Sequence, residues 1–319
     1  GLANVLPIAA ITRASGGRDL VDMADLVAAG AVAFSDDGRP VPESRVMRLA
    51  LEAAAAAGSL VIDHCEDRSL AEGGAINEGA VSTRLGIPGI PAAAEDVMVA
   101  RDIILAEAAG TRVHIAHLST AGAVRMVGEA KARGVRVSAE ATPHHLLLTD
   151  EAIEAPDTNF KMNPPLRSAS DAAALVEALR TGVVDAIATD HAPHTAEEKS
   201  RDFAAAPFGI VGLETAVSLV LDRLVRPGTI SFPRFVELFS AGPARLLGLT
   251  RKGRLAAGAD ADLTILDPDL PVTVDKTRFE SKGRNTPFDG WVLRGGPVMT
   301  IVGGRIVYPF DDRDAGGRP

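Results

Sequence analysis

The stretch that decides the fold is Val183-Val184-Asp185-Ala186-Ile187-Ala188-Thr189-Asp190-His191-Ala192-Pro193-His194, an apolar run that ends in a carboxylate and two imidazoles. The apolar part is short enough for a buried strand, and Pro193 ends it because proline has no backbone N–H to donate. In a parallel barrel or a doubly wound sheet such a strand ends at the C-terminal rim, where reacting groups are held. We therefore expect the chemistry of this protein at that rim.

The same pattern of a strand-like run followed by a helical stretch recurs along the chain. The strand-like runs cover residues 5–12, 31–35, 60–64, 112–118, 135–141 and 184–189. The stretches between them that predict helices cover residues 43–57, 95–109, 121–133 and 171–180. This alternation predicts an α/β fold with a parallel sheet and crossover helices. About six βα units are present, so the sheet is either an open doubly wound sheet or a (β/α)8 barrel of the TIM type whose first two units lie upstream of Gly1.

The pattern changes after Leu249. Helical stretches at 213–225 and 233–247 follow the last strand, and short strand-like segments then cover residues 262–266, 272–274, 291–293, 298–302 and 305–308. We predict a barrel over residues 1–249, the C-terminal part of a small β-sandwich over 250–310 and a flexible tail over 311–319. These strands are too few for a sandwich, and we expect that an N-terminal part of the protein is absent from the sequence.

Composition limits the function classes. The chain has 319 residues, 46% of them hydrophobic, and a formal net charge of -9, which fits a globular protein and argues against nucleic acid or an anionic membrane as a partner. No apolar run reaches the ~20 residues that a membrane span requires. Cys65 is the only cysteine, so we expect a reducing compartment, the cytoplasm. Because the net charge argues against nucleic acid and membrane, we expect a small-molecule substrate.

Alternation of side chains along a strand tests which polar residues face the barrel mouth. In residues 31–37, Val32 and Phe34 share a face with Asp36, so Asp37 points into the mouth, although Asp37-Gly38 also reads as a simple turn. The same counting turns Asp190 inward and Asp185 toward the helices.

Histidines at two other strand ends join these acids. His64 and His117 fall at the ends of their strands, whereas His114 faces away and reads as a packing residue. The counting turns Cys65 toward the helix layer, which argues against a nucleophile. His144 and His145 are assigned a supporting or structural role.

Asp37, His64, His117 and Asp190 thus converge on one rim as the predicted metal ligands. Carboxylates and imidazoles without thiolates form a ligand set suited to zinc, with manganese, cobalt or iron as alternatives. Four polar strand ends aimed at one mouth are hard to explain as packing.

Several motifs carry a resemblance to bacterial type I dihydroorotases of the amidohydrolase superfamily. They are residues 30–38 (GAVAFSDDG), 63–66 (DHCE), 117–120 (HLST), 142–146 (TPHHL), 161–167 (KMNPPLR), 188–194 (ATDHAPH) and 207–209 (PFG). They occur in the family's order from Gly1 to about Tyr308.

The resemblance implies a zinc-dependent cyclic amide hydrolase with one or two zinc ions, which reversibly closes N-carbamoyl-L-aspartate to dihydroorotate in pyrimidine (UMP) synthesis. It implies that Asp37 bridges two metal positions, that His64 and His117 ligate one of them, and that Asp190 ligates the other and is the catalytic proton carrier. It also implies that Asn163, His194 and the backbone around Phe208 and Gly209 hold the substrate. A homodimer and an association with aspartate transcarbamoylase are both compatible with it.

The sequence departs from the family pattern in one respect. No histidine precedes His64, so the His-x-His-x-Arg run expected on the first strand is missing, and we expect the chain as given to be inactive. Hydantoinases and allantoinases resemble a version with a carboxylated lysine at the position of Asp37, which argues against them. A non-catalytic dihydroorotase-like scaffold subunit is a further alternative, which the four retained ligands argue against.

Overall fold

The computed structural model describes residues 2–308 of the chain, which divide into two compact units. Unit 2 consists of residues 6–213 and 276–287, and unit 1 of residues 2–5, 214–275 and 288–308. Helices within residues 216–246 group with the C-terminal strands in unit 1. The domain boundary at residue 249 stays a prediction, and the predicted tail at 311–319 lies outside the described residues.

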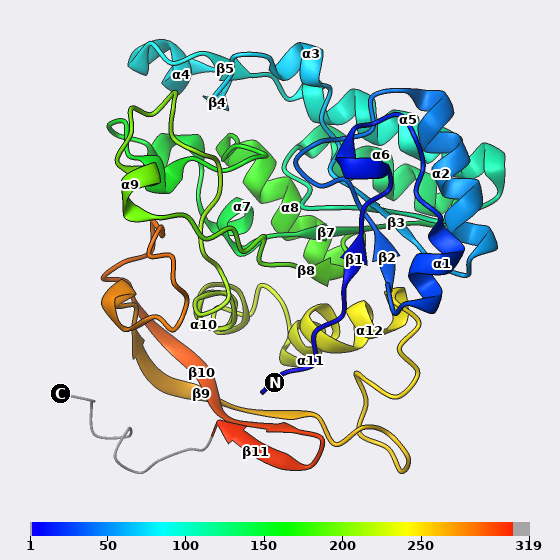
Figure 1. Ribbon diagram of the computed structural model, residues 1–319. Coiled ribbons are helices and arrows are strands. Elements are labelled where there is room, and N and C mark those ends of the chain that lie inside the picture. The colour runs from blue at the N-terminus through cyan, green and yellow to red at the C-terminus, as the bar shows by residue number, and fades with distance from the viewer. Residues whose placement is uncertain (1, 309–319) are drawn as a thin grey trace. The chain divides into compact units, whose positions relative to one another are not determined.

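Unit 2 is built on one sheet of six parallel strands (Figure 1). In spatial order these are β1 (Ile8–Ala9), β2 (Ala33–Phe34), β3 (Val61–Asp63), β6 (Val113–Ile115), β7 (Val137–Ala141) and β8 (Ala186–Ile187). Every one of them falls inside a strand-like run of the sequence. The register places Val61, Val113 and Val137 side by side, so the carboxyl ends of neighbouring strands meet at one edge.

Except for the first, the following helices that connect these strands lie where the sequence predicts helices. They are α1 (Met23–Ala28), α2 (Ser44–Ala56), α5 (Ala93–Ala109), α6 (Ala121–Ala132) and α8 (Ala169–Thr181). Side-chain caps begin three of them: the Asp22 side chain accepts from Asp25 N, Thr120 Oγ1 accepts from Ala123 N, and Ser168 forms a capping box with Asp171. Glycines with positive φ end two of them, Gly110 after α5 and Gly182 after α8.

The core of unit 2 lies between the strands and these helices. Val61, Val113 and Ile115 on the strands are fully buried, as are Leu51 in α2 and Val99 in α5. Each such side chain contributes roughly 1.5–3 kcal/mol of burial free energy, which holds the strand ends at fixed positions.

Residues 66–91 form a structured excursion between β3 and α5. Its elements are α3 (Arg68–Ala71), β4 (Ile76–Asn77), α4 (Ala80–Leu85) and β5 (Gly89–Ile90), and β4 pairs with β5 in parallel. Ile76 and Val81 pack against Ile153 and Phe203. The segment 73–91, which the sequence does not identify as a lid or an interface, is thus attached to its own unit.

Short elements complete unit 2. They are α7 (Pro143–Leu147), α9 (Ala196–Lys199) and the 3-10 turns η1 (Arg13–Ser15), η2 (Asp150–Ala152), η3 (Thr158–Phe160) and η6 (Lys276–Arg278). Of these, α7 and α9 follow β7 and β8 and begin at threonine caps, Thr142 and Thr195.

Unit 1 combines short helices with an antiparallel sheet. The helical turns are α10 (Ala216–Val220), η4 (Leu221–Val225, a π-helix), α11 (Phe232–Val236), η5 (Glu237–Ala241, a π-helix) and α12 (Gly242–Leu246). The strands are β9 (Leu263–Thr273), β10 (Val292–Val302) and β11 (Arg305–Tyr308), in the order β11-β10-β9. The predicted small sandwich is represented in the described residues by this one sheet.

The expectation of separate short strands in this region is wrong. Residues 263–273 and 292–302 are each one continuous strand, and the turn-like Pro268 lies inside β9. The register shifts between Arg294 and Gly296 and again between Pro297 and Met299, so bulges accommodate proline and glycine within the pairing. In the described part of the chain, no helix combines the length and the hydropathy that crossing a membrane would take.

Candidate active site

Two adjacent carboxylates follow β2 and point in opposite directions. Asp36 is buried, and its Oδ1 accepts from the backbone N–H of Ile11 at 2.8 Å and of Thr12 at 3.2 Å. The Asp37 side chain is 57% exposed, and its Oδ1 lies 3.2 Å from His64 Nδ1 and 3.4 Å from His117 Nε2. The alternation argument therefore places both side chains correctly, with Asp36 tying β2 to the chain after β1.

Asp37, His64 and His117 bring three ligand atoms to one point. His64 follows β3 directly and His117 lies two residues beyond β6, and their Nδ1 and Nε2 atoms are 3.0 Å apart. Both imidazoles are buried, while the carboxylate opens to solvent. The structure thus joins three of the four predicted metal residues from three neighbouring strands.

The spacing of these atoms fits a small metal ion. Tetrahedral zinc with bonds of about 2.0–2.1 Å would hold its ligand atoms ~3.3 Å apart, and the three distances here are 3.0, 3.2 and 3.4 Å. His117 Nδ1 is buried and lacks a hydrogen-bond partner among the described residues. The donor set and its geometry are those of one face of a metal site.

The electrostatics of the site favour a bound positive charge. Burial alone would lower the pKa of His117, but the hydrogen bond to Asp37 and the charges of Asp190, Asp37 and Glu140 raise that pKa to about 9. Burial would raise the pKa of Asp37, yet the two imidazoles hold it well below its usual range. Without a metal ion, a proton on His117 is the cation that this site attracts.

Asp190 lies three residues beyond β8 and belongs to the same electrostatic cluster. Burial raises the pKa of its carboxyl group, the negative charges of Asp37 and Glu140 add to that rise, and the imidazoles of His117 and His64 oppose it. Asp190 is not one of the three residues whose ligand atoms converge. Its role as a metal ligand and catalytic residue stays a prediction.

His117 and Asp190 both have left-handed backbone conformations, with φ of 29° and 47°. Such values are uncommon for residues other than glycine and cost of order 1–3 kcal/mol each. They turn the chain just beyond β6 and β8. This strain at two candidate site residues is the kind that a functional site retains.

Asn163 is held beside the imidazoles by Glu66. Asn163 Nδ2 donates to Glu66 Oε2 at 2.7 Å and lies 3.5 Å from His64 Nε2. Asn163 and Phe208 also line a cavity of about 520 Å³, whose other walls come from residues 66–74 and Ile90. Asp37, His64 and His117 do not line this cavity. The cavity lies next to them because Asn163, which lines it, is 3.5 Å from His64.

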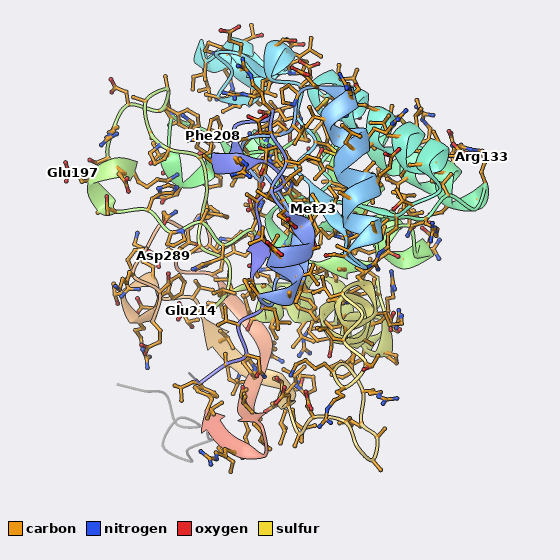
Figure 2. All side chains as sticks on the ribbon, turned by 45° about the vertical axis from the view of Figure 1, so that its right-hand side comes forward. Met23, Arg133, Glu197, Phe208, Glu214 and Asp289 are labelled. Atoms are coloured by element: carbon orange, nitrogen blue, oxygen red, sulfur yellow. The ribbon has the colours of Figure 1, made fainter. Side chains whose placement is uncertain are left out.

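His194, Phe208 and Gly209 form a second connected group. His194 Nε2 donates to the Phe208 carbonyl at 2.8 Å, and Gly209 N donates to the Lys161 carbonyl at 2.9 Å. Figure 2 labels Phe208 and Glu197, the latter on α9 beyond His194. Two backbone groups predicted to hold substrate are therefore already paired within the chain, and substrate binding by His194, Phe208 and Gly209 stays a prediction.

Three further histidines are buried away from the ligand atoms of the cluster. His114 is buried with Ser138 Oγ at 2.8 Å and Glu140 Oε2 at 3.1 Å, as expected for a residue that faces away from the mouth. His145 Nε2 donates to the Pro164 carbonyl at 2.9 Å, and burial lowers its pKa to about 3. His144 is also buried, and burial holds its pKa well below the usual range.

A second acidic cluster lies on the helix side of β3. Asp63, Cys65 and Asp102 are buried together, and the Arg101 guanidinium donates to Asp102 Oδ1 at 2.7 Å and to Asp63 Oδ2 at 3.3 Å. Arg101 already supplies the cation that these carboxylates need. Burial raises the pKa of the Cys65 thiol, which fits the expectation that it is no nucleophile.

The comparisons with known proteins agree with this geometry. A dihydro-orotase-like family model matches residues 1–123, and an amidohydrolase family model matches residues 80–308. The dihydroorotase of Pelotomaculum thermopropionicum is 60% identical to this chain, over 96% of this chain and 72% of the relative. The dihydroorotase of Bacillus caldolyticus is 51% identical, over 96% of this chain and 71% of the relative. The chain belongs to the dihydroorotase family. It spans about 72% of the length of the first of these relatives.

Hydantoinases share the fold of this dihydroorotase-family chain. L-hydantoinase from Arthrobacter aurescens matches with a TM-score of 0.82 and 30% identity, over 90% of this chain and 67% of its own. D-hydantoinase from a Thermus species matches with a TM-score of 0.78 and 28% identity, over 95% and 68%. The fold is therefore α/β of the amidohydrolase kind, and the six parallel strands described in unit 2 correspond to part of its barrel.

Sequence reasoning misses several residues that shape the site. Glu66 orients Asn163, and Asn285 Nδ2 donates to the carbonyls of Ala192 and Gly209, both at 3.0 Å. Lys161 and Lys199 bind the segment that contains Phe208. Glu66 and Lys161 stand in quoted motifs, residues 63–66 and 161–167, which offers a weak signal. Asn285 and Lys199 lie outside these motifs and bind backbone carbonyls, which no motif records.

Proposed function

We propose dihydroorotase as the function, the reversible cyclisation of N-carbamoyl-L-aspartate to (S)-dihydroorotate with loss of water in pyrimidine synthesis. That the chain as given is inactive by itself stays a prediction. Asp37, His64, His117 and Asp190 are assigned as ligands of one or two zinc ions. The single observation that carries this proposal is the convergence of Asp37 Oδ1, His64 Nδ1 and His117 Nε2 within 3.4 Å in a chain of this family.

The chemistry divides between a metal ion and the chain. A divalent ion would lower the pKa of a coordinated water and polarise the carbonyl under attack. In ring closure Asp190 accepts the proton from the carbamoyl nitrogen as that nitrogen forms a bond to the side-chain carboxyl carbon. A C–O bond of that carboxyl group then breaks, and its oxygen leaves as water with the proton held by Asp190 and one further proton from solvent. In ring opening Asp190 takes a proton from water and returns it to the ring nitrogen. The pKa of Asp190, raised by burial, brings this carboxyl closer to the working pH of a general base.

Binding of the substrate is assigned to the residues around the neighbouring cavity. Asn163, whose amide is oriented by Glu66, and His194 offer hydrogen bonds to the carboxylate or carbonyl oxygens of the substrate. Phe208 lines the same cavity as Asn163, and Gly209 follows it in the chain. These roles are proposals that rest on the position of Asn163 and Phe208 at the cavity.

Turnover of dihydroorotate by the zinc-loaded full-length protein tests the function. We expect Asp190→Ala to reduce kcat by roughly 10²–10⁴-fold, the range typical of a lost general base, while circular dichroism shows an unchanged fold. Substantial turnover in this variant would contradict the assignment of the base.

A cyclic amidase of the hydantoinase type is the second candidate, because solved hydantoinases match the fold with TM-scores of 0.82 and 0.78. Preferential hydrolysis of hydantoin or allantoin over dihydroorotate would establish it. A zinc-free, inactive full-length protein would instead favour a scaffold role.

We further propose a cytoplasmic location, a homodimer as the first oligomer to test, and aspartate transcarbamoylase as a partner to test. The proposed domain boundaries, a barrel to residue 249 and a smaller β domain over 250–310, belong to the same set. Light scattering alone and with aspartate transcarbamoylase decides the two assembly proposals.

A further inference from the structure

Two buried lysines lie against the segment of residues 203–209. Lys161 Nζ donates to the carbonyls of Phe203 at 2.6 Å, Ala204 at 3.0 Å and Ala206 at 2.7 Å. Lys199 Nζ donates to the carbonyls of Pro207 at 3.0 Å and Gly209 at 2.9 Å. Together the two ammonium groups bind five carbonyls within seven residues.

The partners of these lysines make the arrangement unusual. Lys161 is 2% exposed and Lys199 8%, and the hydrogen bonds of both go to backbone carbonyls rather than to carboxylates. Burying an ammonium group costs several kcal/mol, so an apolar side chain of similar length would serve packing better. What the lysines provide is multiple charge-assisted hydrogen bonds to an irregular segment whose carbonyls have no strand to pair with.

The segment that they hold reaches the candidate site. The Phe208 carbonyl accepts from His194 Nε2, and the Phe208 ring lies 4.5 Å from Lys161 Nζ and lines the cavity with Asn163. Lys161 also stands two residues before Asn163, and its own carbonyl accepts from Gly209 N. The lysines therefore connect the three chain segments that carry the proposed substrate-binding residues.

We propose that Lys161 and Lys199 are positioning residues for substrate binding, which hold the carbonyls of residues 203–209 so that Phe208, which lines the cavity with Asn163, and His194 stay in place. The proposal rests on the proposed function only for the identity of the ligand, dihydroorotate. Neither lysine touches the reacting atoms in this assignment.

Lys199→Met and Lys161→Met in the zinc-loaded full-length protein test the proposal. Each removes the ammonium group and keeps most of the buried volume. The matched control is Lys131→Met: Lys131 Nζ donates to the Val183 carbonyl at 2.7 Å and pairs with Asp185, next to the start of β8 and far from these segments in the hydrogen-bond network. Amide hydrogen exchange is measured along the chain, and KM and kcat are measured for dihydroorotate hydrolysis.

We expect Lys199→Met and Lys161→Met to increase exchange in residues 203–209 and to raise KM about tenfold or more, with kcat changed by less than about threefold. Lys131→Met should leave both the exchange of residues 203–209 and KM unchanged. Lys199→Gln, which keeps an N–H donor, should give an intermediate KM. If the methionine variants do not fold, the KM and the exchange of residues 203–209 in Lys199→Gln test the proposal.

Three outcomes would overturn the proposal. One is an unchanged KM together with increased exchange, which would make the lysines purely structural. A second is equal exchange of residues 203–209 in Lys199→Met and Lys131→Met. The third is a loss of kcat without a rise in KM. A wild-type protein that does not turn over dihydroorotate refutes the proposed function instead, and exchange still decides whether the lysines hold the segment.

Discussion

At the scale of single residues, Asp36 and Asp37 separate folding from metal binding within two positions. Asp36 is an internal acceptor for the backbone N–H groups of Ile11 and Thr12, whereas Asp37 reaches His64 and His117 at the solvent-facing side. The two carboxylates are chemically identical, so their surroundings alone assign their roles. Variants at these two positions form a matched pair.

Asp36→Ala should lower the free energy of unfolding by about 1–3 kcal/mol, because buried N–H groups lose their acceptor, and should retain zinc. Asp37→Ala should lose zinc while the stability of the metal-free protein changes by less than about 1 kcal/mol, since that side chain is largely exposed. Urea unfolding and metal analysis measure the two effects. Zinc at wild-type stoichiometry in Asp37→Ala would contradict its assignment as a ligand.

His145 gives the protein a dependence on acid. Burial lowers its pKa to about 3 in the folded chain, against an ordinary value of 6.5. Below pH 6.5 the unfolded chain therefore binds a proton that the folded chain does not, and stability falls as the pH falls. The loss from this residue approaches about 1.4 kcal/mol per pH unit until the pH reaches its folded pKa.

His145→Gln should remove this part of the acid sensitivity. Unfolding free energies of the metal-free protein, measured from pH 7 down to about 5, should decline less steeply in the variant than in the wild type. A difference between the two proteins that stays constant with pH would show that His145 does not titrate on unfolding.

At the scale of elements, the buried Arg167 side chain connects the excursion of residues 66–91 to α5 and to the chain after β6. Arg167 donates to Asn77 Oδ1 at 3.1 Å and to the Ile90 carbonyl at 2.8 Å, from β4 and β5, and lies 3.8 Å from Glu95 in α5. Ser119 Oγ accepts from Arg167 Nε at 3.0 Å. Because this excursion forms most of the wall of the cavity beside Asn163, the ion pair also fixes the shape of that cavity.

Arg167→Met should destabilise the protein by about 3–5 kcal/mol, because it leaves the carboxylate of Glu95 buried without its cation. The double variant Arg167→Met/Glu95→Gln should recover part of that loss, since the uncompensated charge is removed. Chemical denaturation of the single and double variants measures both. Equal losses in the two would argue against the ion pair as the cause.

At the scale of the whole molecule, unit 2 has a site to which successive strands each contribute one ligand. Asp37, His64 and His117 follow β2, β3 and β6, so an ion bound to them would tie three neighbouring strands together. Binding to the folded state alone stabilises that state by mass action.

Removing zinc with a chelator should lower the melting temperature of the full-length protein by roughly 5 °C, the shift expected when about 2–3 kcal/mol of binding free energy is lost. Added zinc should restore it. Calorimetry measures the shift, and Asp37→Ala should show none. A chelator effect of the same size in that variant would place the stabilising ion elsewhere.

The strand and helix pattern of unit 2 is predictable because each strand is a short apolar run and each helix carries its own caps. The convergence of Asp37, His64 and His117 on one side is also predictable, although β2 and β6 end at Phe34 and Ile115, before two of these residues. The alternation of side chains holds within each strand, and turns carry the chain from the strand end to the site residue. The positive φ of His117 and of Asp190 in these turns could not be predicted from the sequence.

Other features depend on contacts between distant residues. Glu66 and Asn163 are 97 residues apart, and Lys161 binds a segment more than 40 residues away, so neither pairing has a local pattern. The full lengths of β9 and β10 could not be predicted from the sequence for a different reason. Proline and glycine ordinarily mark turns, and only the paired strand reveals that they sit in bulges here.

The opposite surroundings of Asp36 and Asp37 make the chain after β2 intolerant of a change in length. Neighbouring side chains point to opposite faces. Deletion of Ser35 would therefore place the Asp37 carboxylate beneath Thr12 and turn the Asp36 carboxylate toward the face that Ser35 now occupies. Such a deletion should abolish zinc binding and weaken folding together, whereas Ser35→Ala should spare both. The spacing of this turn, more than its composition, sets the position of the ligand.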